Sequence, residues 1–303
     1  MRLKISHVNT DELNKFCIIP GRKPLNIESV KKLWKDGISK PELCFIAESD
    51  GEIKGRIGFR IAESEKQLNI FGLLLPELDD VSSEISKIFF ESILQIMRDK
   101  GIHTIGYYLN SSKENHLKEL KLLESCGMEI IQTKKNFILK NEDYQPKTEN
   151  RLIYKTLSEI GKENFLKAFE EVTEKTLDRE DEWIYNKLGS QIAAEDHFNL
   201  LENLGDPDDT WYLAYRNETF IGLIIPQKFN DKFGAINYIG VIPSQRGNNY
   251  VSDLLDKGVN NLVERNVQEI IADIDDRNFP MENSLTKIGF REEKKIWVLK
   301  FIL

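Results

Sequence analysis

The sequence repeats itself at a spacing of 167 to 168 residues, and this repeat constrains the fold more than any other feature. The matching segments predict two strands around a tight turn, followed by a further strand. The matched positions are Ala47 with Ala214, Gly55 with Gly222, Gly72 with Gly240 and Asn110 with Asn278. We therefore expect two copies of one fold, the alternative being two unrelated α/β domains.

The segment 141–151 has almost no apolar residues and lies between two strand-like runs, which is typical of a linker. A chain of 303 residues is also long enough for two domains. We predict domains at 1–140 and 152–303, joined by 141–151. In each, a strand, one or two helices and a hairpin precede a long amphipathic helix, a strand, a short helix and a last strand. This order indicates an α/β (α+β) fold with helices on the faces of a mixed sheet.

Composition excludes several classes of function. A net charge of −8 disfavours nucleic acid as a partner, because phosphate binding needs a clustered basic face. The three cysteines and four histidines show no metal-ligand spacing, so no metal is expected. The apolar runs are far shorter than a membrane span, and the first residues alternate like a strand rather than a signal peptide. These features predict a cytoplasmic protein that binds no membrane.

The stretch 240–255 resembles the strand, loop and helix with which the GCN5-related N-acetyltransferase (GNAT) family binds the pyrophosphate of coenzyme A. A permissive loop that leads into a helix favours an anion, because the first N–H groups of the helix are unpaired. Arg246 adds a positive charge. The resemblance implies tandem GNAT domains, each a mostly antiparallel sheet flanked by helices, with acetyl-CoA as the co-substrate. The implied cofactor-binding residues are Ile239, Gly240, Val241, Gln245, Arg246, Gly247, Asn248, Asn249, Tyr250, Val251 and Asn278.

Two glycine positions of the family loop hold Asn249 and Val251 in this chain. Asparagine tolerates a left-handed backbone, whereas valine does not, and the sequence leaves open whether these two residues weaken coenzyme binding. The alternative is an ordinary turn from strand to helix. The stretch 275–290 is similar to the family segment beside the thiol arm, but Leu285 stands where many members have a tyrosine that protonates the thiolate.

The first copy lacks this binding chemistry. Residues 77–84 contain four carboxylates and no glycine, arginine or lysine where the pyrophosphate loop would lie. Like charges oppose phosphate binding. We therefore expect a degenerate first copy that closes the substrate cleft or buries an edge of the second.

The resemblance implies an N-acetyltransferase that moves an acetyl group to a primary amine of a small molecule by direct attack on the thioester. The attack needs a proton acceptor, because an alkyl ammonium has a pKa of about 10. Candidate catalytic residues are Asp273 and Asp275, which share one face of a strand, and Tyr238; each has a solvated, capping or core role as its alternative. The alternative function is a catalytically silent acyl-CoA-binding or protein-interaction module. The sequence leaves the amine acceptor and the oligomeric state open.

Overall fold

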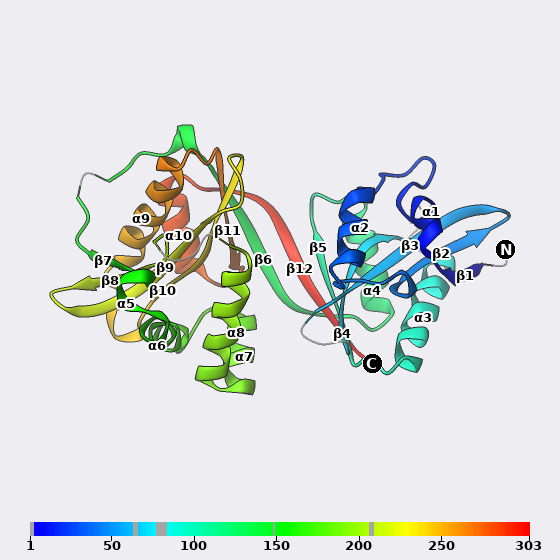
Figure 1. The fold of residues 1–303 in the computed structure, drawn as a ribbon, viewed down its shortest axis with the longest axis horizontal. Coiled ribbons are helices and arrows are strands. Elements are labelled where there is room, and N and C mark those ends of the chain that lie inside the picture. Colours follow the sequence, from blue (N-terminus) through cyan, green and yellow to red (C-terminus); the bar gives the residue numbers. More distant parts are fainter. Residues whose placement is uncertain (1–2, 63–65, 77–83, 148, 206–208) are drawn as a thin grey trace. The chain divides into compact units, whose positions relative to one another are not determined.

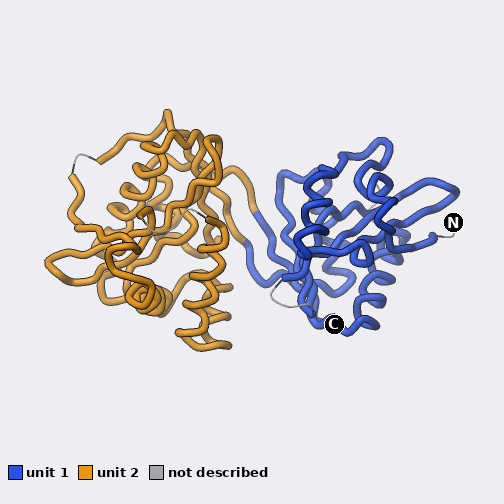
Figure 2. Tube along the Cα trace, viewed as in Figure 1, with its two compact units in different colours: residues 1–133, 296–303 blue, residues 134–295 orange. Residues whose placement is uncertain are grey.

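The structure is a computed structural model that describes residues 3–62, 66–76, 84–147, 149–205 and 209–303. The chain forms two compact units (Figure 2). Unit 1 contains Met1–Thr133 and Ile296–Leu303, and unit 2 contains Lys134–Lys295. No described helix has the length and apolar composition that a bilayer span requires.

Unit 1 is a mixed sheet with helices on both faces (Figure 1). Its strands follow the order β1-β2-β3-β4-β5-β12, in which β4 and β5 are parallel and the other neighbours are antiparallel. Its elements are β1 (Lys4–His7), η1 (Thr10–Glu12), α1 (Leu13–Cys17), α2 (Ile27–Lys35), η2 (Pro41–Leu43), β2 (Cys44–Ser49), β3 (Glu52–Ile61), β4 (Gln67–Leu74), α3 (Glu84–Asp99), β5 (Thr104–Asn110), α4 (His116–Ser125), the start of β6 (Glu129–Lys140) and the end of β12 (Arg291–Ile302).

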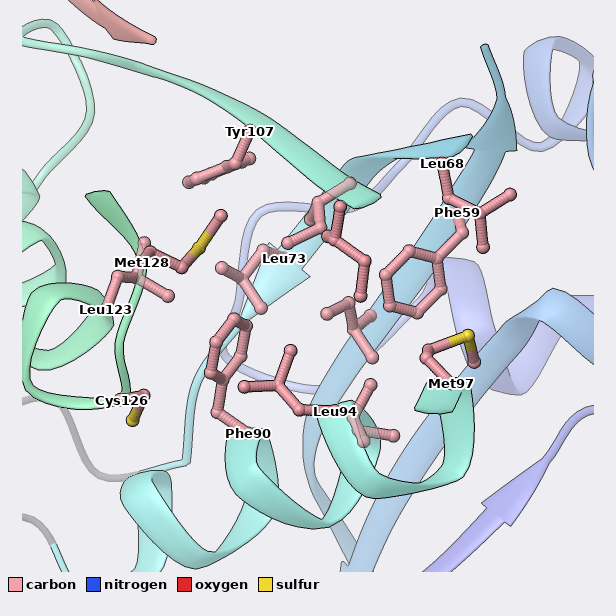
Figure 3. Packing of buried hydrophobic residues seen from close by; sticks show 14 of the residues in the cluster. Phe59, Leu68, Leu73, Phe90, Leu94, Met97, Tyr107, Leu123, Cys126 and Met128 are labelled. Atoms are coloured by element: carbon pink, nitrogen blue, oxygen red, sulfur yellow. The ribbon is translucent and has the colours of Figure 1, made fainter. Parts of the chain in front are cut away.

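The main core of unit 1 lies between the sheet and helices α3 and α4 (Figure 3). Helix α3 contributes Phe90, Leu94 and Met97, which recur at the spacing of one helical face, and β3 contributes Phe59. A second core covers the opposite face, where Phe16 of α1 packs edge-to-face on Phe71 of β4 at 6.1 Å.

Unit 2 repeats this plan (Figure 1). Its strands follow the order β7-β8-β9-β10-β11-β6, and again one pair, β10 with β11, is parallel. Its elements are the end of β6, η3 (Asn141–Asp143), β7 (Ile153–Thr156), α5 (Leu157–Ile160), α6 (Lys162–Thr173), α7 (Arg179–Leu188), α8 (Ser190–Asn203), β8 (Tyr212–Arg216), β9 (Thr219–Lys228), β10 (Phe233–Val241), η4 (Pro243–Gln245), α9 (Tyr250–Glu264), β11 (Glu269–Asp275), α10 (Phe279–Ile288) and the start of β12. The predicted fold class, with its mostly antiparallel sheets, is confirmed.

The repeat holds in the hairpins, where Ala47 pairs with Gly55 and Ala214 pairs with Gly222. The two glycines allow a close approach, since a Cβ on Gly222 would lie 2.1 Å from the carbonyl oxygen of Gly240. A Cβ on Gly55 would lie 2.9 Å from the corresponding oxygen of Leu74.

The later matches of the repeat need correction. The contacts of the two hairpin glycines make Leu74, and not Gly72, the counterpart of Gly240. Likewise Asn278 precedes α10 where Asn115 precedes α4, so Asn110 is not its counterpart. Loops of unequal length shift the offset after each hairpin, and a fixed offset cannot follow them.

The boundaries of the two units differ from the predicted 1–140 and 152–303 in two segments. The end of β6 pairs with β11 over the register from Lys134↔Asp275 to Lys140↔Glu269, which places these residues in unit 2. The end of β12 pairs with β5 from Ile296 to Ile302, which places it in unit 1. The alternation of side chains along a strand is the same whichever edge the strand joins, so the sequence pattern does not reveal the exchange.

Candidate functional site

A cavity of about 700 Å³ lies between β10 and β11 in unit 2. The two strands pair in parallel only where Phe233–Ala235 faces Glu269–Ile271. Just beyond, the register of β10 against β9 shifts between Ile236 and Tyr238, which marks Asn237 as a β-bulge. The following residues of both strands, 236–241 and 272–275, line the cavity.

The cavity connects the two faces of the sheet. On one face the core includes α9 and α10, and on the other it includes α6 and α8. The lining residues come from both sides: Val251, Leu255, Met281 and Leu285 from α9 and α10, and Val172, His197 and Tyr238 from the side of α6 and α8. Two molecules could therefore meet within the sheet from opposite faces.

The predicted anion-binding loop borders this cavity. Gly247 and Asn249 have left-handed backbones, with φ of +84° and +60°, and α9 begins at the next residue, Tyr250. Gly247, Asn249, Tyr250 and Val251 all line the cavity, so the positive end of α9 faces it. Val251 lies inside the first turn of α9, and the loop takes its left-handed residues from 247 and 249 instead.

Replacing Asn249 tests this loop geometry. We expect Asn249→Val to destabilise unit 2 by about 1–2 kcal/mol, because a β-branched residue is strained in the left-handed region. Asn249→Gly is the matched control and is expected to change stability by less than about 0.5 kcal/mol. Urea unfolding measures both. Equal losses in the two variants would contradict the assigned backbone role.

The structure uses Arg246 differently from the expected phosphate contact. Its guanidinium donates hydrogen bonds to the carbonyl oxygens of Val241 (2.9 Å), Val172 (3.2 Å), Glu174 (2.8 Å) and Lys175 (2.7 Å). These bonds use four of the five N–H donors of arginine. Arg246 therefore fixes the loop to the end of α6, and an anion would sense mainly its charge.

Other predicted binding residues have local structural partners. Tyr250 accepts a hydrogen bond from Arg216 at 2.7 Å, and Asn278 caps α10 by accepting from the N–H of Met281 at 3.2 Å. Ile239, Gly240, Val241, Gln245 and Asn278 line the cavity as well. Asn248 is not among the lining residues; its amide donates to the carbonyl of Gln245 at 3.1 Å.

The three predicted catalytic residues all line the cavity, but they differ in exposure and in the groups that they contact. Asp275 is buried and forms an ion pair with Arg179, whose Nε and a terminal nitrogen lie 2.7 and 3.1 Å from its two oxygens. Asp273 is exposed and accepts a hydrogen bond from Asn136 at 2.6 Å. The hydroxyl of Tyr238 is hydrogen-bonded to that of Thr173 at 2.8 Å, and burial raises the pKa of Tyr238.

Sequence reasoning missed a group of titratable residues on the wall formed by α7 and α8. Nδ1 of His197 lies 3.7 Å from a carboxylate oxygen of Asp181, and both residues line the cavity. Burial, followed by the charge of Asp178, raises the pKa of Asp181 to about 8. Burial lowers the pKa of His197. The only sequence signal was the acidic run 178–182, which is typical of a helix start and does not point to His197.

In unit 1 the corresponding position between β4 and β5 is filled by polar side chains. Lys113 lies 2.6 Å from one oxygen of the buried Glu119, donates to the carbonyl of Leu73 at 3.1 Å, and Tyr107 donates to Glu119 at 2.6 Å. By strand register, the counterparts of Leu73 and Tyr107 are Ile239 and Ala272. Both counterparts line the cavity of unit 2.

Comparisons with known proteins agree with this geometry. The sequence model of the acetyltransferase (GNAT) family matches residues 169–290, which include the loop, α9, β11 and α10. No curated protein is significantly similar to the chain in sequence. Within the described residues no group of three or more histidine, cysteine or acidic side chains is placed to bind a metal ion.

Several solved structures share the fold over nearly the whole chain. A GCN5-related N-acetyltransferase from Sphaerobacter thermophilus is 16% identical, with a TM-score of 0.65 and coverage of 99% of this chain and 95% of that one. A tandem GNAT protein from the clavulanic acid biosynthesis pathway is 13% identical, with a TM-score of 0.61 and coverage of 99% and 98%. The glucosamine N-acetyltransferase region of a fungal multi-domain protein is 12% identical, with a TM-score of 0.67, and the match covers 99% of this chain but 38% of that one.

The family match and the fold lead to one conclusion: residues 169–290 form a domain of the acetyltransferase (GNAT) family, within a chain that has the fold of tandem GNAT proteins.

Proposed function

We propose that this protein is an acetyl-CoA-dependent N-acetyltransferase that acts on a primary amine of a small molecule. The observation that carries the proposal is the cavity that crosses the sheet between β10 and β11, beside the N-terminus of α9. Membership of the GNAT family supports acyl transfer from acetyl-CoA in general.

The residues around the cavity fit the parts of acetyl-CoA. The first turn of α9 and the left-handed Gly247 and Asn249 suit the pyrophosphate. Only one edge of β10 pairs with a strand over 238–241, namely with β9. Alternate N–H groups on its other edge can therefore bind the thioester carbonyl. When bound, acetyl-CoA supplies an activated acetyl group with a thiolate as leaving group.

The buried, apolar Leu285 offers no acid for the departing thiolate. A thiol with a pKa of about 8.5 is about 2 kcal/mol from leaving as thiolate at pH 7, so transfer does not require such an acid. The acceptor side of the cavity includes the carboxylates Asp178 and Asp273, which favour a positively charged amine.

We also propose that the first copy binds no coenzyme. Its support is the cluster of Lys113, Glu119 and Tyr107, which fills the position that is open in unit 2. The acidic segment predicted to repel phosphate, with Asp79 and Asp80, lies outside the described residues.

Calorimetric titration with acetyl-CoA, followed by a thiol-release assay with a panel of amines, tests both proposals. We expect one binding site per chain and release of thiol with at least one small primary amine. Two equivalent sites would contradict the degenerate first copy. Absence of binding would contradict the proposed function, whereas binding without transfer to any amine would favour the silent acyl-CoA-binding alternative.

A further inference from the structure

We propose that His197 accepts the proton from the acceptor amine and that Asp181 positions and stabilises its imidazole. This inference rests on the proposed N-acetyltransferase function. It names residues on α7 and α8, which belong neither to the predicted anion-binding loop nor to the strands β10 and β11.

The position of His197 fits this role. Its ring lies 5.0 Å from the ring of Tyr238 on β10, in an edge-to-face contact. Tyr238 is two residues before Gly240, which corresponds to about 7 Å along a strand. An amine that enters from the α7 and α8 side and attacks a carbonyl bound at Ile239–Val241 would therefore pass close to the imidazole.

The imidazole is held in place on several sides. It stacks on Phe169 of α6, with ring centroids 6.0 Å apart, and meets Asp181 of α7 at 3.7 Å. The side chain of His197 is 24% exposed, so it is neither free in solvent nor sealed from the cavity. A fixed group of this kind can receive a proton without first reorienting.

The charges around the pair are also defined. Lys134 of β6 lies 3.7 Å from Asp178 and 3.3 Å from Glu180, and Asp196 lies beside His197 on α8. The lowered pKa of His197 keeps the imidazole neutral at pH 7 and able to accept a proton. Because the pKa of Asp181 is about 8, its carboxyl group can release a proton to water once the imidazole is charged. The pair then returns to zero net charge.

The transfer step balances with these groups. The bound ammonium first gives one proton to a ring nitrogen of His197. The free amine nitrogen then forms a bond to the acetyl carbon, and the electron pair of the breaking C–S bond stays on sulfur. The second proton of the nitrogen passes to the departing thiolate, which leaves as the thiol. The other candidates are less suitable acceptors: both oxygens of Asp275 contact Arg179, and Tyr238 is a neutral hydroxyl at pH 7. Asp273 is exposed and bound to Asn136.

The test uses the full-length chain with an amine identified in the thiol-release panel. We expect His197→Gln to lower kcat by about 100-fold or more, as for the loss of a general base. Asp181→Asn is expected to lower kcat by about 10-fold, with recovery in Asp181→Glu. The matched controls His103→Gln and Asp11→Asn change exposed residues of unit 1 and are expected to stay within about twofold of the parent. Titration with acetyl-CoA is expected to give the same affinity in all variants.

The pH profile of kcat separates proton transfer from a structural role. A base with a lowered pKa is active above that pKa, so kcat of the parent should fall only below about pH 6.5. This acid limb should vanish in His197→Gln and keep its position in Asp181→Asn, because Asp181 is uncharged below its pKa of about 8. If the parent is active and His197→Gln retains its kcat and acid limb, the inference is overturned while the proposed function stands. A parent that transfers to no amine would overturn both.

Discussion

A fragment of residues 151–303 is expected to be insoluble or unfolded, whereas a fragment of residues 134–295 is expected to fold. Starting the fragment at residue 151 removes the end of β6, residues 134–140, which pairs with β11 along the full length of β11. It also removes Phe137 and Leu139, which are 2% and 1% exposed in the core of unit 2. Losing a buried Phe or Leu side chain costs about 2–5 kcal/mol each, against a total stability of about 5–15 kcal/mol for a domain.

Solubility, circular dichroism and urea unfolding of the two fragments would measure this effect. The fragment 134–295 is the matched control, because it keeps unit 2 and omits the strand end that pairs with β5. If the fragment 151–303 folds with the stability of the longer one, the end of β6 is not a structural part of unit 2.

The variant Lys113→Met is expected to destabilise unit 1 by about 3 kcal/mol. Removing one partner of a buried ion pair leaves the charge of the other partner uncompensated. The remaining carboxylate, Glu119, has a side chain with no exposed area. The double variant Lys113→Met/Glu119→Gln is expected to regain at least half of the loss, since the neutral amide can still accept the hydrogen bond from Tyr107.

Hydrogen exchange of peptides from β5 and α4 would measure the change within unit 1. A loss of about 3 kcal/mol corresponds to exchange about 100-fold faster in Lys113→Met for amides that exchange by unfolding of the unit. Exchange as slow as in the parent would show that Glu119 finds another partner. A double variant as unstable as the single one would show that the charge of Glu119 is not the cause.

Local patterns in the sequence predicted much of the fold and one side of the site. The hairpins around Gly55 and Gly222 were visible because a tight strand pair needs glycine at a fixed place. The loop before α9 was visible because Gly247, Asn248 and Asn249 stand directly before an amphipathic stripe. Such turns and helix starts depend only on residues that are neighbours in the chain, and the sequence of the chain lists all of these neighbours.

The tertiary structure decided which partners distant residues find. Arg246 was predicted as a cation for phosphate, but the end of α6 presents carbonyl oxygens that take most of its donors. Asp275 was predicted as a base, but Arg179 lies against it. In both cases the sequence gives the charge of the side chain, while the geometry of a separate element determines what that charge contacts.

The sequence by itself determined two related α/β domains and a helix start suited to an anion in the second. Only the tertiary structure decided that β6 and β12 end in different units from those in which they begin, and that His197 and Asp181 face one cavity. The physical reason is the same for both. The edge of a strand or the face of a helix has the same local sequence pattern as many other edges and faces of the chain. Which of them pair or pack together therefore depends on the assembled core.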